Sequence, residues 1–364
     1  MYADYKNGIT NLACSILKYY GAEYSHDTLA TMDSLLEHSY KNVVVMLFDG
    51  MGMDALNYHL PQSSFLRRHL VTEYSSVFPP TTTAATISLE SGLTPAEHGW
   101  MGWSLYFSEI DKIVNIFTNK DKYTKEEAAN YHVAWRYLPY KSIYEKIADT
   151  GKAKAYSVSK FGSNKVITLE ELFREITGLC SQEGKKYIYS YWEDPDKTMH
   201  DVGCYEETVT NIIKEIDHKV EEMCQELEDT LVIVTADHGH CNLTHYELSD
   251  YPYLVNMLQR PISIETRAAA FYVKEEFLLE FPDRFHELFG NDFFLFSKEQ
   301  IKEQKIFGDG TPHPKFDTFI GDYLAVAIAD KGIVYDHNSA RHQSNHAGMN
   351  EKEMLIPFIA IEKK

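Results

Sequence analysis

Six short runs of consecutive apolar residues limit what this chain can fold into more than any other feature of its sequence. Such runs are typical of strands buried on both faces, as in a parallel sheet with helices on either side. Helical patterns alternate with them, most clearly from Tyr205 to Leu227, where apolar residues recur at spacings of three and four. The alternation predicts a doubly wound α/β fold with a mostly parallel central sheet and helices on both faces. The predicted strands are Val43–Phe48, Tyr187–Tyr191, Leu231–Thr235, Ala268–Val273, Tyr323–Ala329 and Leu355–Ala360.

Two stretches fit this alternation poorly. The segment from Trp100 to Tyr140 is rich in aromatic and charged residues and has no clean period. Residues 245–318 contain one strand-like run and two helix-like segments. We therefore expect a single catalytic domain over residues 1–364, with residues 245–318 as a small inserted cap subdomain.

Charge and cysteine usage narrow the functional classes. The net charge is -19, and no basic stripe is present, which argues against binding of a nucleic acid polymer. A small anionic substrate stays compatible with this charge, because bound cations can invert the local field of an acidic site. No signal-peptide pattern and no membrane-spanning apolar run is found, so we expect no membrane association. The dispersed cysteines fit reduced thiols, hence a cytoplasmic protein; they are Cys14, Cys180, Cys204, Cys224 and Cys241.

Acidic residues follow three of the predicted strands. Asp49 directly follows the first run, Asp196 lies shortly after the second, and Asp237 lies two residues past Thr235. Because the carboxyl ends of parallel strands meet at one edge of a sheet, we expect these carboxylates to lie close together. The sequence therefore predicts an acidic site at this edge.

Histidines accompany these carboxylates. His200 is four residues after Asp196, His238 follows Asp237, and His346 precedes the last apolar run. Three aspartates and three histidines form a mixed oxygen and nitrogen set that suits zinc, with manganese or iron as alternatives. Six ligands divide into two sites with three protein ligands each, which leaves positions open for substrate.

A run of prolines and threonines, from Phe78 to Thr83, leads into a helix-like segment that ends near Gly92. The start of a helix offers free backbone N–H groups and a positive dipole end, which together bind anions. A threonine hydroxyl is a poor nucleophile unless it is deprotonated, and direct coordination to a divalent metal would deprotonate it. The segment therefore predicts a threonine nucleophile beside a bound phosphorus centre.

These motifs, in this order, resemble the alkaline phosphatase superfamily, and most closely its branch of nucleotide pyrophosphatase/phosphodiesterases and phosphonoacetate hydrolases. The resemblance covers most of the chain, from Asp49 to Gly348. The motifs are Asp49-Gly-Met-Gly, the Pro-Thr-Thr-Thr helix entry with Gly92-Leu-Thr-Pro-Ala-Glu-His-Gly99, Asp196-x3-His200, Asp237-His-Gly and Asn-His346-Ala-Gly.

The resemblance implies a role for each matching residue. Asp49, Asp237 and His238 would hold one divalent metal, together with the nucleophile, and the second metal would be held by Asp196, His200 and His346. The family nucleophile lies ten residues before the Gly of the Ser/Thr-Gly-Leu step, so that counting back from Gly92 selects Thr82. The implied activity is hydrolysis of a small phosphate ester through a covalent Thr82 intermediate.

Two positions depart from the phosphodiesterase pattern. Ala85 stands where that branch has an asparagine three residues after the nucleophile, and Thr83 stands where it has an aromatic residue. Phosphonoacetate hydrolysis or phosphomonoester hydrolysis with the same metals therefore stays open, as does a metal-stabilised binding protein without turnover. The oligomeric state is also open, and so is the role of His313, which could face the substrate. His240 matches no ligand position of the family.

Overall fold

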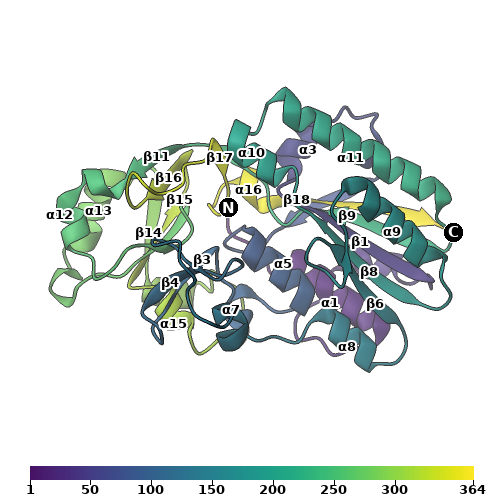
Figure 1. Cartoon of the computed structure of the whole chain (residues 1–364), viewed down its shortest axis with the longest axis horizontal. Coiled ribbons are helices and arrows are strands. Elements are labelled where there is room, and N and C mark those ends of the chain that lie inside the picture. Colours follow the sequence, from purple (N-terminus) through teal and green to yellow (C-terminus); the bar gives the residue numbers. More distant parts are fainter.

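Seven strands form the main sheet, in the order β2-β18-β9-β1-β8-β6-β7 (Figure 1). The computed structural model describes residues 1–364. β1, β6, β7, β8 and β9 pair in parallel, whereas β18 runs antiparallel to both of its neighbours. The predicted mostly parallel central sheet is confirmed. Its strands are β1 (Asn42–Phe48), β2 (Leu70–Ser75), β6 (Lys154–Ser159), β7 (Asn164–Lys165), β8 (Lys186–Trp192), β9 (Thr230–Thr235) and β18 (Leu355–Lys363).

Helices cover both faces of the main sheet (Figure 1). α3, α9 and α11 lie on one face, and α1, α5 and α8 lie on the other. α11 confirms the predicted helix, because its buried stripe follows the predicted three- and four-residue spacing. These helices are α1 (Ile9–Tyr20), α3 (Met53–His59), α5 (Thr82–Ser91), α8 (Ile143–Asp149), α9 (Leu169–Ser181) and α11 (Glu207–Glu226). The shorter helices are α2 (Ala30–Leu35), α4 (Phe65–Arg68), α6 (Pro95–His98), α7 (Val133–Tyr137), α10 (Asp196–Val202), α12 (Pro252–Asn256), α13 (Phe281–Phe289), α14 (Lys298–Glu303), α15 (Phe316–Phe319) and α16 (Glu351–Met354).

The register of the central strands brings their carboxyl ends level. Every residue of β1 is buried, which explains its unbroken apolar run. Phe48 of β1 pairs with Trp192 of β8, and Leu47 pairs with Thr235 of β9. The segments that follow these three strands therefore start side by side at one edge of the sheet.

A second seven-stranded sheet lies beside the main one (Figure 1). All of its pairs are antiparallel, in the order β14-β15-β13-β12-β3-β4-β5. It takes three short strands from the segment between Trp100 and Tyr140, where the sequence shows no period. The strands are β3 (Ser104–Phe107), β4 (Lys112–Asn115), β5 (Lys120–Asp121), β12 (Ser263–Ile264), β13 (Ala268–Phe271), β14 (Phe293–Ser297) and β15 (Tyr323–Ala327).

Two predicted strands belong to this second sheet instead of the parallel one. The runs Ala268–Val273 and Tyr323–Ala329 form β13 and β15, which pair antiparallel with each other. Their apolar runs are unbroken because alternate residues pack against two separate hydrophobic clusters, so that both faces of the sheet are covered there. The second sheet also uses strands on either side of residues 245–318, and the delimitation of those residues as a cap stays a prediction.

Two small strand pairs form separate two-stranded sheets. β10 (Cys241–Asn242) pairs antiparallel with β17 (Ser344–Asn345), and β11 (Thr244–Glu247) pairs in parallel with β16 (Lys331–Val334). All five cysteines are buried and form no disulfide. None of the helices combines the length and the apolar character that crossing a membrane requires.

Candidate active site

One group of potential metal ligands lies at the carboxyl ends of β1 and β9. Oxygen and nitrogen atoms of Asp49, Asp237 and His238 all lie within 4.8 Å of one another. The Gly50 N–H donates to Asp237 Oδ1 at 3.1 Å, which fixes that carboxylate. Asp237 Oδ2 is buried without a hydrogen-bond partner. A buried carboxylate oxygen of this kind is costly unless a cation occupies the space beside it, so the group fits a metal.

A second group lies beside the first one. It consists of Asp196, His238, His240 and His346, whose ligand atoms also lie within 4.8 Å of one another. His240 Nε2 lies 2.5 Å from Asp196 Oδ1, and His346 Nε2 lies 3.7 Å from the same oxygen. The rings of His238 and His346 stack with their centroids 3.8 Å apart. His238 therefore lies between the two groups.

The structure and the sequence differ over one histidine. His200 Nε2 lies 3.4 Å from Asp196 Oδ1, next to the second group but not within it. His240 takes a place in the group that the sequence did not assign to it. The antiparallel pairing of Cys241 with Asn345 brings His240 level with His346, a long-range pairing that no local pattern signals. The role of His200 as a ligand stays a prediction.

Hydrogen bonds fix the orientation of all four imidazoles. In each ring Nδ1 faces a protein oxygen: Pro80 O for His346 at 3.1 Å, Gly239 O for His238 at 3.1 Å, and Ser344 O for His200 at 2.9 Å. The fourth contact joins His240 Nδ1 to Ser344 Oγ at 3.1 Å. A ring that donates from Nδ1 to a carbonyl presents the lone pair of Nε2 to the site, which is the tautomer that a metal requires.

The charges of the site favour bound cations. Burial raises the pKa of Asp49 well above its usual range, and the neighbouring charges of Asp237 and Asp196 raise it further. Burial also raises the pKa of Asp237. Asp49 and Asp237 therefore cannot both stay ionised in such a buried space unless positive charge is supplied, whereas, against the effect of burial, neighbouring histidines lower the pKa of Asp196. The chemistry of the donor set thus agrees with its geometry.

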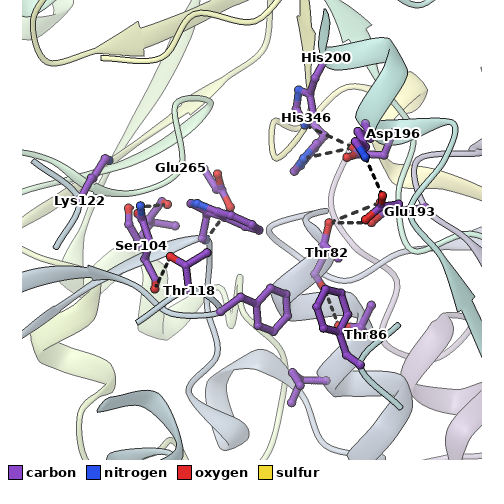
Figure 2. A pocket seen from close by; sticks show the side chains of 18 of the residues that line it. Thr82, Thr86, Ser104, Thr118, Lys122, Glu193, Asp196, His200, Glu265 and His346 are labelled. Carbon is purple, nitrogen blue, oxygen red and sulfur yellow. Dashed lines mark hydrogen bonds and ion pairs between the residues drawn. The ribbon is translucent and has the colours of Figure 1, made fainter. Parts of the chain in front are cut away.

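Thr82, labelled in Figure 2, is the first residue of α5, and its hydroxyl lies beside the first group. Its Oγ1 lies 3.3 Å from Asp49 Oδ2 and 3.2 Å from His238 Nε2. Thr81, the residue before the helix, donates its hydroxyl to Glu265 Oε1 at 2.7 Å, and the Trp103 N–H donates to the same oxygen at 2.7 Å. Glu265 thereby ties the start of α5 to the second sheet.

A cavity of about 1600 Å³ opens in front of Thr82. Its lining combines residues at the edge of the main sheet with residues of the second sheet, and Lys122 and Glu265 lie on the second-sheet side (Figure 2). Aromatic side chains, among them Trp103, Phe117 and Trp135, line it and are partly exposed. His313 is not among the lining residues. The cavity has room for a substrate much larger than a phosphate ion.

A buried threonine hydroxyl at the start of a helix lies beside two groups of potential metal ligands at the carboxyl edge of a mostly parallel sheet, an arrangement that fits a metal-dependent hydrolase. Comparison with known protein families agrees. The model of the family described as type I phosphodiesterase / nucleotide pyrophosphatase matches residues 43–280, which is more than half of the chain. The chain belongs to this family, a two-metal hydrolase family of the alkaline phosphatase superfamily. It is therefore an enzyme of the phosphodiesterase class.

Solved structures share the fold. Murine ectonucleotide pyrophosphatase/phosphodiesterase 5 aligns with a TM-score of 0.66 and 20% identity over 87% of both chains. An inactive variant of the same murine protein, in complex with AMP, gives the same values. Phosphonoacetate hydrolase from Sinorhizobium meliloti, in complex with phosphonoformate, aligns with a TM-score of 0.63 and 15% identity over 87% of this chain and 89% of that chain. At sequence identities of 15% and 20%, these matches show that the fold is shared and nothing more.

Proposed function

We propose that this enzyme hydrolyses small phosphodiesters through a covalent intermediate on Thr82. The observation that carries the proposal is the position of Thr82 Oγ1, which lies 3.2–3.4 Å from Asp49 and His238 at the start of a helix. No other hydroxyl combines contact with a ligand group and a place at the N-terminus of α5. The solved complex of the related murine protein holds AMP, a small phosphate compound.

The chain's own residues would perform most of the reaction. Thr82 Oγ1 would attack phosphorus in line, forming a bond to it while the bond to the leaving oxygen breaks. Free backbone N–H groups at the start of α5 would face the phosphoryl oxygens. When bound, two divalent cations would lower the pKa of the Thr82 hydroxyl and offset the charge of the phosphoryl oxygens. Water would then attack the Thr82 ester, release the phosphorus-containing product and restore the hydroxyl.

We assign Asp49, Asp237, His238 and Thr82 to one cation, and Asp196 and His346 to the other. His200 and His240 are both within reach of Asp196 and compete for the remaining place. Zinc is the proposed metal, because the donors are carboxylates and imidazoles in a small buried space. Metal analysis of the purified protein would distinguish it from manganese and iron. Loss of one ion in His200→Ala but not in His240→Ala would support the family-derived assignment.

The nucleophile has a matched test. Thr82→Ala should retain metal and lose turnover of a bis-aryl phosphodiester by at least about 10,000-fold, because the attacking oxygen is gone. Thr83→Val is the control, since the neighbouring Thr83 Oγ1 is buried and has no hydrogen-bond partner. It should keep turnover within a few fold. An active Thr82→Ala enzyme would refute the nucleophile.

Phosphonate hydrolysis is the second candidate. Lys122 lines the cavity, and an ammonium there could bind the carboxylate of a small phosphonate such as phosphonoacetate. The fold similarity to phosphonoacetate hydrolase is the reason for choosing phosphonoacetate as the phosphonate to test. Side-by-side turnover of a bis-aryl phosphodiester, an aryl phosphomonoester and phosphonoacetate would separate the candidates. Fastest turnover of the diester is expected.

A further inference from the structure

The cavity continues past Thr82 along one face of α5. Thr82, Thr86 and Glu90 follow one another at intervals of four residues, and all three line the cavity. Figure 2 shows the first two in succession along the helix. With a rise of about 1.5 Å per residue, Glu90 lies roughly 12 Å along the axis from the nucleophile. One ester arm of a substrate held at Thr82 can therefore extend along this face toward Glu90.

The far end of this face carries a carboxyl group among aromatic rings. The hydroxyls of Tyr140 and Tyr144 donate to Glu90 at 3.0 and 3.3 Å. These two bonds use half of the acceptor positions of the carboxylate, so that positions remain for a ligand. Burial raises the pKa of Glu90 to about 7, against the two tyrosine hydrogen bonds, which lower it. A positive charge beside Glu90 would favour its ionised form.

A second polar group faces the same region without a partner. Tyr189 is 2% exposed and lines the cavity, and its hydroxyl has no hydrogen-bond partner in the protein. Its ring centroid lies 6.3 Å from that of Tyr144, which binds Glu90. A buried hydroxyl of this kind is costly when unpaired, so a ligand group that donates to it would be favoured.

The rest of the lining sets the charge that the cavity accepts. The lining contains no arginine, the side chain best suited to a second phosphate or a carboxylate. Carboxylates outnumber lysines even when the assigned metal ligands are left out. The carboxylates are Glu90, Glu145, Glu193, Asp201, Glu265 and Asp336, and the lysines are Lys122, Lys125 and Lys197. An ester arm with a negatively charged end is therefore disfavoured along the α5 face.

We propose that Glu90, together with the Tyr189 hydroxyl that lines the same cavity, binds a positively charged amine at the end of one ester arm of the substrate. The amine would donate to the free acceptor positions of Glu90 and to the Tyr189 oxygen, and the surrounding rings would face its charge. This inference rests on the proposed phosphodiesterase activity and adds the class of substrate. The enzyme would thus prefer diesters that carry an alkylamine arm over neutral diesters of the same length.

The test uses 4-nitrophenyl phosphodiesters with two-, four- and six-carbon arms that end in an amine, a methyl group or a carboxylate. We expect kcat/KM for the amine to exceed that for the neutral arm by roughly tenfold. The longest arm should gain most, because Glu90 lies roughly 12 Å from Thr82 along α5. Glu90→Gln should remove this preference while turnover of the neutral diesters changes little.

Glu145→Gln is the matched control. Glu145 also lines the cavity, but its carboxylate is engaged by Ser142 at the start of α8, and glutamine can keep that cap. This variant should keep the amine preference. Equal turnover of amine and neutral arms, or an amine preference that survives in Glu90→Gln, would overturn this inference but not the proposed phosphodiesterase activity. Preference for the carboxylate arm would also overturn it and would point to Lys122. Absence of turnover with every arm would overturn the proposed phosphodiesterase activity, and this inference with it.

Discussion

The two seven-stranded sheets contribute to the active site in different ways. Segments that follow strands of the main sheet carry the three aspartates proposed as metal ligands: Asp49 comes directly after β1, Asp196 opens α10 shortly after β8, and Asp237 lies two residues past β9. The second sheet supplies walls of the cavity and one carboxylate, Glu265, that supports the start of α5. Parallel strands with level ends place reactive groups tightly, whereas an antiparallel sheet built from distant segments can vary without disturbing them. We therefore expect changes at the main-sheet edge to affect turnover and changes in the second sheet to affect substrate binding.

The largest effect is expected at the main-sheet edge. Asp237→Asn should lower kcat on the order of 10,000-fold, because the buried Oδ2 that lacks a partner is replaced by an amide. Metal content should fall with it. Steady-state kinetics and metal analysis of the same preparation measure both. A change confined to KM would contradict the division of roles between the two sheets.

The next effect concerns the ion pair that joins the two regions. Arg267, just before β13, binds Glu353 of α16 through two contacts of 2.6 and 2.7 Å, and both side chains are fully buried. Arg267→Met should lower the free energy of unfolding by about 3–5 kcal/mol, because it leaves a buried carboxylate unpaired. Denaturant unfolding measures this loss.

A double variant serves as the control for this ion pair. Adding Glu353→Leu to Arg267→Met removes the unpaired charge and should restore much of the stability. Glu353 also accepts the Gly348 N–H at 2.7 Å, two residues after His346. If the double variant is as unstable as Arg267→Met, the unpaired charge of Glu353 does not cause the loss of stability.

A smaller effect is expected where the second sheet meets the nucleophile. Glu265→Ala removes the acceptor of both the Thr81 hydroxyl and the Trp103 N–H, a loss of about 1–3 kcal/mol. If Glu265 positions Thr82, kcat should fall at least tenfold with little change in KM, and Glu265→Gln should recover most of it. A change in KM alone would indicate that Glu265 contacts the substrate and does not position Thr82.

The smallest effect is expected on the wall itself. Trp103 is partly exposed and lies edge-on to Phe117, with the ring centroids 5.9 Å apart. Trp103→Ala should raise KM about fivefold for an aryl phosphodiester and leave kcat nearly unchanged, because apolar contact with the substrate is lost. A fall in kcat comparable with that of Glu265→Ala would show that Trp103 does more than contact the substrate, and the expected difference between Trp103 and Glu265 would be wrong.

The same contrast explains how much the sequence could predict. Val43–Phe48 and Leu231–Thr235 are unbroken apolar runs that are buried throughout, so the central strands and the acids after them could be located directly. β5 and β12 are two residues long and pair with segments far away in the chain, and no periodicity can reveal such strands. The runs in β13 and β15 were predicted as strands, but burial on both faces does not distinguish parallel from antiparallel pairing.

The site was predicted to a similar degree. Asp49, Asp196, Asp237, His238 and His346 come together as expected, because each follows a strand end or a small strand pair. His240 was missed because its place depends on the pairing of Cys241 with Asn345. The contacts of Glu90 and Glu265, for which we propose roles, could not be predicted, because a single acid on a helix or a turn carries no sequence pattern.

The position of β18 has a consequence for how the protein is made. β18 lies between β2 and β9 and follows both of them in the chain. While the ribosome is still adding residues, β9 thus presents an open edge and β2 has no strand neighbour. Open strand edges invite pairing with other nascent chains. His346 also emerges only shortly before β18, so a chain synthesised no further than β9 can neither seal its sheet nor bring His346 to the candidate metal ligands.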